Sequence, residues 1–157
     1  MFAVSFRSYD YRVMTKEKIM NSDRIIDIAI EYLEKINRRD FDGLLGLMSP
    51  HHRLVSEKGE TIVGSEKARE TLTDYTSTYP EFQIHISDIY LIGNTVVVVG
   101  RTTGSCAGLT RGTEIRRRLI YVIRVEEGSV AEFKYAIDDT DQVRNDLGVC
   151  EATKITE

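Results

Sequence analysis

Two side chains in the second half of the chain, a histidine and an arginine, have the chemistry of a binding or catalytic site. His85 lies on a strand-like segment, and imidazole is the side chain whose ordinary pKa is closest to neutral pH. Arg117 is predicted to share a strand face with Leu119 and Tyr121. A guanidinium at a pocket mouth could hold a ligand carboxylate through two parallel hydrogen bonds. The structural alternatives are a solvated strand histidine and an arginine at a solvated strand end.

Other common kinds of site are not indicated. The two cysteines and three histidines show no CxxC spacing, so we expect no metal and no cofactor. The glycine-rich segment 100–112 lacks the spacing of a phosphate-binding loop. The net charge is −4, and the basic run 116–118 would alternate between the two faces of a strand, so nucleic acid is not an expected partner. No apolar run approaches the ~20 residues that cross a bilayer, so we expect a cytoplasmic protein without membrane contact.

The first half of the chain has helical patterns. Apolar residues at 3–4 spacing predict a helix from Ser22 to Arg38. Tyr32 sits beside that apolar stripe, where its ring can be buried and its hydroxyl can point into a cavity. Asp40 is expected to cap a second, short helix, and Ser65 a third helix that ends at Pro80.

Strand patterns dominate from residue 82 onward. The alternation slips by one residue at Ser87–Asp88, which predicts a β-bulge that bends the sheet. Gly93–Asn94 predicts a tight turn. Further strands are expected at about 114–125 and 130–138, and a hairpin around Lys58–Gly59 precedes the third helix. The sequence therefore predicts a single α+β domain.

Two segments, Val96–Val99 and Leu119–Val125, are apolar on both strand faces. An antiparallel sheet normally shows one face to water, and burying a valine or isoleucine is worth roughly 1.5–3 kcal/mol. If helices cover one face, the other needs a cover of its own. We therefore expect a homodimer through the outer face of the sheet. The alternative is a sheet that curls tightly enough to bury its own second face.

Three stretches of sequence contain most of the expected elements in order: EYLEKINRRDFDGLLGLMSPH, GETIVGSEKARETLTDY and RLIYVIRVEEGSVAEFKYAIDDTDQVRNDLG. In this order and spacing they resemble the nuclear-transport-factor-2-like (NTF2-like) superfamily, and within it the polyketide-cyclase-like (SnoaL-like) and ketosteroid-isomerase-like branch. The resemblance covers residues 22–148, which leaves 1–21 as an extension that could be loosely attached and 149–157 as a tail. It implies a cone, in which the N-terminal helices pack in a strongly bent mixed or antiparallel sheet around an apolar pocket.

The resemblance also implies positions for site residues. Steroid-isomerase-like members use a tyrosine on the first helix, a carboxylate base and a hydrogen-bond donor on a central strand. Tyr32 matches that tyrosine in its spacing to the following aspartate, and Tyr121 falls near the donor position. Ser56 stands near the base position, where it cannot act as the base. Glu57 is adjacent, but on a strand it would point to the opposite face.

Cyclase-like members place a histidine and an aspartate on the last strand. Those positions hold Phe133 and Tyr135 here, and neither is a base near neutral pH, since a free tyrosine titrates near pH ~10. Asp138, at the end of the last strand, matches a common family aspartate and could act as a pocket base or cap the closing turn. The acid–base residues of both branches are thus largely missing, and the sequence leaves open whether the chain is an enzyme.

These features predict a pocket for a small, apolar, carbonyl-bearing ligand, with isomerase, cyclase or dehydratase activity as what the resemblance implies. The alternative is a non-catalytic dimerisation or interaction module whose cone is filled by its own side chains. The candidate catalytic residues are Tyr32, Tyr121 and Asp138, and the candidate ligand-binding residues are Ser56, His85, Arg117, Phe133 and Tyr135.

Overall fold

A mixed sheet with helices against it makes up the computed structural model, which describes residues 16–137 and 153–155 of the 157-residue chain. The strands lie in the order β2-β1-β6-β5-β4-β3-β7. Neighbouring strands are antiparallel, except that β1 and β6 run parallel. In chain order the elements are α2 (Lys16–Arg38), α3 (Phe41–Leu47), β1 (Met48–Val55), β2 (Thr61–Val63), α4 (Ser65–Thr78), β3 (Gln83–Ile92), β4 (Thr95–Thr103), α5 (Arg111–Glu114), β5 (Leu119–Glu126), β6 (Ser129–Ile137) and β7 (Thr153–Ile155).

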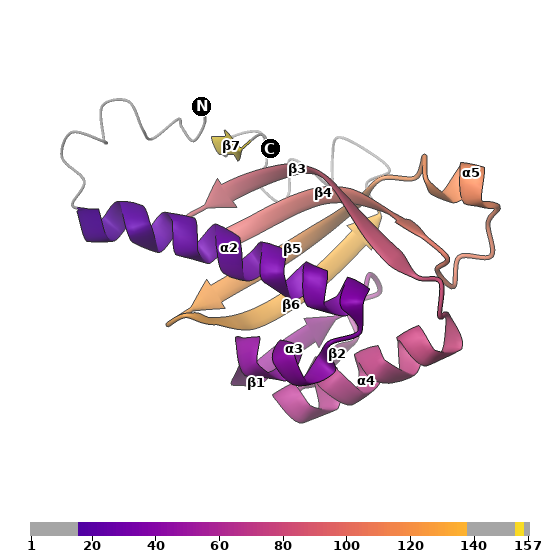
Figure 1. Cartoon of the computed structure of the whole chain (residues 1–157), viewed down its shortest axis with the longest axis horizontal. Coiled ribbons are helices and arrows are strands. Elements are labelled where there is room, and N and C mark those ends of the chain that lie inside the picture. Colours follow the sequence, from indigo (N-terminus) through magenta and orange to yellow (C-terminus); the bar gives the residue numbers. More distant parts are fainter. Residues whose placement is uncertain (1–15, 138–152, 156–157) are drawn as a thin grey trace.

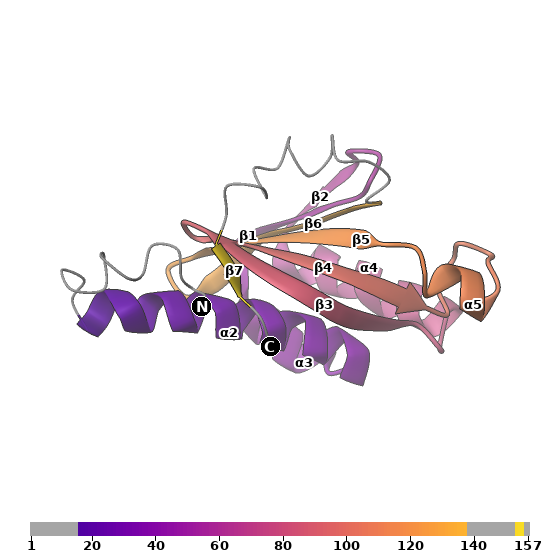
Figure 2. The ribbon, with the colours of Figure 1, turned by 90° about the horizontal axis from the view of Figure 1, so that it is seen from above.

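Helix α2 lies across one face of the curved sheet, as Figures 1 and 2 show from two directions. The predicted stripe is buried there, with Ala29, Leu33 and Ile36 at most 1% exposed. The helix begins at Lys16 instead of Ser22, because the residues before Ser22 are mostly good helix formers. In the described ranges, no helix is both long enough and apolar enough to cross a membrane.

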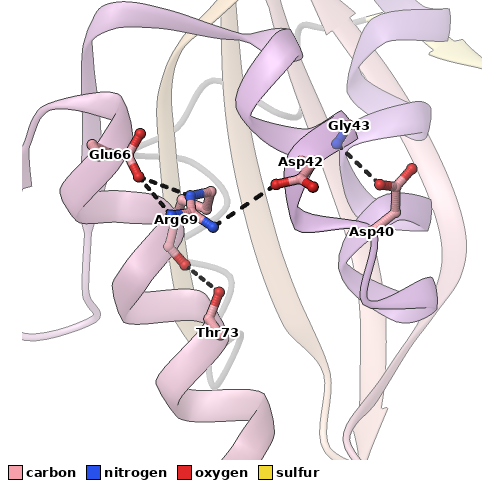
Figure 3. Close-up of polar contacts among 6 residues, drawn as sticks. All are labelled: Asp40, Asp42, Gly43, Glu66, Arg69 and Thr73. Atoms are coloured by element: carbon pink, nitrogen blue, oxygen red, sulfur yellow. Dashed lines mark hydrogen bonds and ion pairs between the residues drawn. The ribbon is translucent and has the colours of Figure 1, made fainter.

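The two short helices α3 and α4 meet at a polar corner (Figure 3). Asp40 caps α3 as predicted, because its carboxylate accepts a hydrogen bond of 3.0 Å from the backbone N–H of Gly43. Arg69 on α4 binds Glu66 of its own helix at 2.6 Å and reaches Asp42 of α3 at 4.0 Å. Such exposed ion pairs add little stability, about 0–1 kcal/mol each. Of the two, only the Arg69–Asp42 pair joins α4 to α3.

The start of α4 differs from the prediction. Ser65 is already the first helical residue, and the cap position is Gly64, which makes no side-chain cap. Gly64 has a φ of 112°, a conformation that a residue with a Cβ rarely adopts. The chain leaves β2 through this glycine turn, so Ser65 is not in the extended conformation of a capping residue.

The bend of the sheet falls where the sequence predicted it. The pairing of β3 with β4 shifts register between Ile86 and Asp88, which is the β-bulge expected at the phase slip. The tight turn at Gly93–Asn94 is also present, with Gly93 at a φ of 60°. A further irregularity separates Arg124 from Val125 in the β5–β6 pairing.

The strand expected at about 114–125 is wrong at its start, because β5 begins only at Leu119. Before it, Thr110 caps the short helix α5 by accepting a hydrogen bond from the backbone N–H of Thr113. The carboxylate of Glu114 is buried against β4, which holds this segment in a helical turn. The arginines at 116–118 therefore lie before the strand and do not alternate along it.

Part of the second face of the sheet has low exposure. Val97 and Val99 are each 1% exposed and Ile120 is 0% exposed, and with Tyr90 they form a second apolar cluster. The homodimer stays a prediction.

The end of α2 is held to the start of β3 and to the connection between α4 and β3. The Asn37 amide donates to the carbonyl oxygen of Ile84 and accepts from the Ile84 N–H, both at 2.8 Å. Arg39, in the left-handed conformation at a φ of 62°, donates to the carbonyl oxygens of Ile36, Pro80 and Phe82. These bonds satisfy backbone groups that a half-buried loop would otherwise leave unpaired.

We expect Asn37→Ala to lower the free energy of unfolding by about 1–3 kcal/mol, because it leaves the Ile84 N–H and carbonyl without partners. Urea denaturation checks this. Asn94→Ala is the matched control, since Asn94 is exposed in a turn and should change stability by less than about 0.5 kcal/mol. Equal losses in both variants would contradict the role of Asn37.

Candidate functional site

A cavity of about 430 Å³ opens between α4, the β1–β2 connection and the inner face of the sheet. Most of its wall is apolar, and its polar side chains come from different elements. The larger apolar lining residues are Ile36, Leu54, Ile62, Leu72, Phe82, Ile84, Leu119 and Phe133. The polar lining residues are Ser56, Glu57, Glu60, Thr71, Tyr75, Thr102, Ser105, Cys106, Arg117, Tyr121 and Tyr135.

Strands β5 and β6 place four of these side chains by simple alternation. Leu119 and Tyr121 are two residues apart on β5, and Phe133 and Tyr135 are two apart on β6, so each pair faces the same side. Tyr121 lies directly opposite Tyr135 in the strand register. The rings of Tyr121 and Phe133 stack, with centroids 5.7 Å apart and planes 6° from parallel.

The loop after β4 closes another part of the wall. It turns at Gly104, whose φ is 71° and where a Cβ would lie 2.5 Å from the backbone oxygen of Glu81. Glycine is needed there for both reasons. The turn brings the backbone N–H of Cys106 to the hydroxyl oxygen of Tyr75, at 3.0 Å, and so ties the loop to α4.

Three tyrosine hydroxyls face this cavity as potential donors. Burial is the main cause that raises the pKa values of Tyr75, Tyr121 and Tyr135 above their ordinary value. All three therefore keep their protons at neutral pH. Within the described part of the chain, the hydroxyls of Tyr121 and Tyr135 have no hydrogen-bond partner. They are available to an oxygen atom of a ligand.

Charged groups lie on two sides of the cavity. Arg117 follows α5, and Glu57 and Glu60 belong to the turn between β1 and β2. Our expectation that Glu57 points to the opposite face is wrong. Because β1 ends at Val55, strand alternation no longer applies at Glu57, and its side chain reaches the cavity rim.

Five of the residues singled out in the sequence meet at this cavity, and two of the other described ones do not. The hydroxyl of Tyr32 is fully buried and does not reach the cavity. His85 is exposed, and its Nε2 lies 3.1 Å from the hydroxyl of Thr103. Asp138 lies outside the described residues. The five that line the cavity are Ser56, Arg117, Tyr121, Phe133 and Tyr135, and their roles stay predictions.

A buried pair between α2 and β1 was missed in the sequence. The Tyr32 hydroxyl donates to Nε2 of His52 at 3.0 Å, and His52 Nδ1–H donates to the carbonyl oxygen of Val130 at 3.0 Å. Both side chains are 0% exposed, and Tyr32 also packs on Phe133, with centroids 4.9 Å apart. One feature of the sequence could have indicated that His52 is buried: it lies two residues before Leu54, so both residues face the same side of the strand.

The described residues include no group of three His, Cys, Asp or Glu side chains that could hold a metal ion. The candidate site is therefore described by its cavity, its hydroxyls and its three charged side chains.

Solved structures share this arrangement of helices and curved sheet. An NTF2-like protein from Cytophaga hutchinsonii superposes with a TM-score of 0.59 at 14% identity, over 79% of this chain and 94% of that one. A protein assigned as a SnoaL-like polyketide cyclase from Jannaschia sp. gives 0.60 at 17% identity, over 78% and 91% of the two chains. One assigned as a ketosteroid isomerase from Kribbella flavida gives 0.59 at 17% identity, over 76% and 82%. The fold is thus that of the NTF2-like superfamily.

The sequence also places the chain in one family within this superfamily. The model of the SnoaL-like domain family matches residues 29–133, and the chain belongs to that family. No curated protein matches the chain in sequence. The predicted resemblance and the predicted cone-like α+β fold are confirmed. At these identities the solved structures share the fold, and activity has to be argued from the cavity.

The buried His52 makes stability depend on pH. Burial lowers its pKa, against smaller raising effects of the bond to Val130 and the charge of Glu132. In the unfolded chain a histidine titrates at about pH 6.5. As the pH falls, the unfolded state therefore takes up the proton before the folded state does. The buried neutral imidazole therefore contributes its full stabilisation above about pH 6.5. This stabilisation is lost as the pH falls towards the lower pKa of the folded state, and the free energy of unfolding then decreases by at most roughly 1.4 kcal/mol per pH unit.

We expect urea denaturation between pH 5 and 7.5 to show this slope, and His52→Gln to flatten it. His51→Gln is the matched control, because His51 is the exposed neighbour on the same strand. A slope that survives in His52→Gln would show that other groups cause it.

Proposed function

We propose that the chain binds a small, largely apolar molecule carrying a carbonyl oxygen, inside the cavity between α4 and the sheet. The supporting observation is the cavity itself, because about 430 Å³ lies within the range of about 300–1,000 Å³ of ligand pockets. Its walls are mostly apolar, with a few polar groups that converge. A cone filled by its own side chains, which the interaction-module alternative needs, would leave no such space.

The tyrosine hydroxyls suit a carbonyl oxygen. Tyr121 and Tyr135 stay protonated at neutral pH, and neither is used by another described residue. A hydrogen bond from such a donor is stronger in a cavity of low polarity than in water. Two of the solved structures that share the fold are assigned as a polyketide cyclase and a ketosteroid isomerase, names that refer to carbonyl compounds.

Isothermal titration with 2-tetralone, a bicyclic ketone, tests this proposal. We expect the ketone to bind more tightly than tetralin, which lacks the oxygen, and Tyr121→Phe to reduce that preference. Ile62→Trp should weaken binding by about 10-fold or more, because the larger ring occupies the cavity. Val63→Trp is its control, since Val63 is the neighbouring residue and is 53% exposed. Equal binding by both tryptophan variants would place the ligand elsewhere.

Proton transfer next to the carbonyl is a second candidate function. It is favoured by the position of Glu57 and Glu60, whose carboxylates line the cavity and raise the pKa of Tyr135 beyond the effect of burial. A carboxylate could take the proton from the carbon next to the carbonyl while a tyrosine hydroxyl stabilises the enolate oxygen. This would supply the first step of an isomerase or a dehydratase.

Hydrogen–deuterium exchange at the acidic carbon of 2-tetralone, followed by NMR, tests this step. We expect the protein to accelerate exchange, and Glu57→Gln or Glu60→Gln to reduce the acceleration by about 10²-fold or more, as for loss of a general base. Glu81→Gln, an exposed residue that does not line the cavity, should leave the rate unchanged. Binding without any acceleration would leave the chain a binding protein.

A further inference from the structure

Arg117 has a hydrogen-bond donor that no described residue uses. Its Nε is buried and has no partner in the described part of the chain, and the residue lines the cavity. Among residues 16–137 and 153–155, no carboxylate forms an ion pair with this guanidinium. A buried N–H without a partner costs free energy, and in native structures such a group calls for an explanation. A ligand atom that accepts from it would provide one.

Glu114, a buried carboxylate three residues before Arg117, is already occupied. Glu114 is 2% exposed, and its Oε2 accepts from the Thr102 hydroxyl at 2.7 Å and from the Ser105 N–H at 3.1 Å. Burial by itself would raise the pKa of Glu114, but these hydrogen bonds outweigh it, so its pKa lies below the ordinary value. The carboxylate is thus held by β4 and its loop. Arg117 is bound to the same residue only through its backbone, whose N–H donates to the Glu114 carbonyl at 2.9 Å.

The charge of Arg117 acts on one side of the cavity. Burial raises the pKa of the Tyr121 hydroxyl, and the positive charge of Arg117 works in the opposite direction. Glu57 and Glu60 act instead on Tyr135. The negative charge of Glu114 also acts on Tyr121, so the case for an anion rests on the Arg117 guanidinium itself, whose buried Nε has no partner among the described residues.

We propose that the ligand is an apolar carboxylic acid, whose carboxylate is bound by the Arg117 guanidinium beside the Tyr121 hydroxyl. This proposal rests on the proposed ligand-binding function of the cavity. A guanidinium presents parallel N–H donors that match the two oxygens of a carboxylate. Arg117 is the only cationic side chain among the described lining residues, which suits one negative charge better than a phosphate dianion.

The size of the cavity limits the rest of the ligand. A volume of about 430 Å³ equals the liquid volume of roughly 14 water molecules. An acid with a bicyclic ring or a short aryl-alkyl chain therefore fits, with its hydrocarbon part against the apolar walls.

Calorimetric titration with 2-naphthylacetic acid and with 2-naphthylacetamide separates charge from shape, since the two compounds have nearly the same size. We expect the wild-type protein to prefer the acid by about 10- to 100-fold, the gain of a charge-assisted hydrogen bond. Arg117→Met should bind both compounds equally, and Arg117→Lys should keep part of the preference. Arg116→Met, at an exposed neighbouring residue, should behave as wild type.

Folding of the variants is read from their thermal midpoints. Arg117→Met removes the unused buried donor, so its midpoint should be no lower than that of the wild type. Equal binding of acid and amide by the wild type would overturn the carboxylate proposal while leaving the cavity as a ligand site. If acid, amide and 2-tetralone all fail to bind, both this proposal and the proposed function fail. A preference for the acid that persists in Arg117→Met would also overturn the assignment of Arg117.

Discussion

The buried hydrogen bond from Tyr32 to His52 connects the main parts of the fold. It joins α2 to β1, and through the bond from His52 to Val130 it joins both to β6. Burial raises the pKa of the Tyr32 hydroxyl and lowers that of His52, so both partners stay neutral and complementary. A lone phenol or imidazole at this depth would be costly to bury. Because the phenol and the imidazole satisfy each other's polar groups, both rings can fill the space between α2 and the sheet.

The cavity begins where this packing ends. A row of rings runs from His52 through Tyr32 and Phe133 to Tyr121, with neighbouring centroids 4.9–5.7 Å apart. The first two rings are sealed in the core, and the last two line the cavity. The same row thus serves as core at one end and as binding wall at the other, which gives the wall a rigid support.

Much of the fold could be predicted from the sequence because it follows from periodicity. The apolar stripe of α2, the cap at Asp40 and the bulge near Ser87 are local patterns, and they appear in the structure. The failures arose where tertiary contacts or glycine geometry override local patterns. Gly64 takes the cap position because it adopts a positive φ, and Glu114 stays in a helical turn because β4 and its loop satisfy its carboxylate.

The candidate site was less predictable than the fold. Alternation along β5 and β6 was enough to bring Tyr121, Phe133 and Tyr135 together. It could not show that the Tyr32 hydroxyl would be taken by a histidine twenty residues away. It also misplaced Glu57, because the position depends on where β1 stops and not on a repeating pattern.

The parallel pairing of β1 with β6 has a consequence for how the molecule forms. These strands are neighbours in the sheet although His52 and Val130 are separated by 78 positions in the chain. Contacts between such distant segments form slowly, because a long loop must close before they can be made. During synthesis, β1 has to wait for its parallel neighbour until almost the whole domain has been made. The cavity, whose wall includes residues of both strands, is then among the last features of the protein to form.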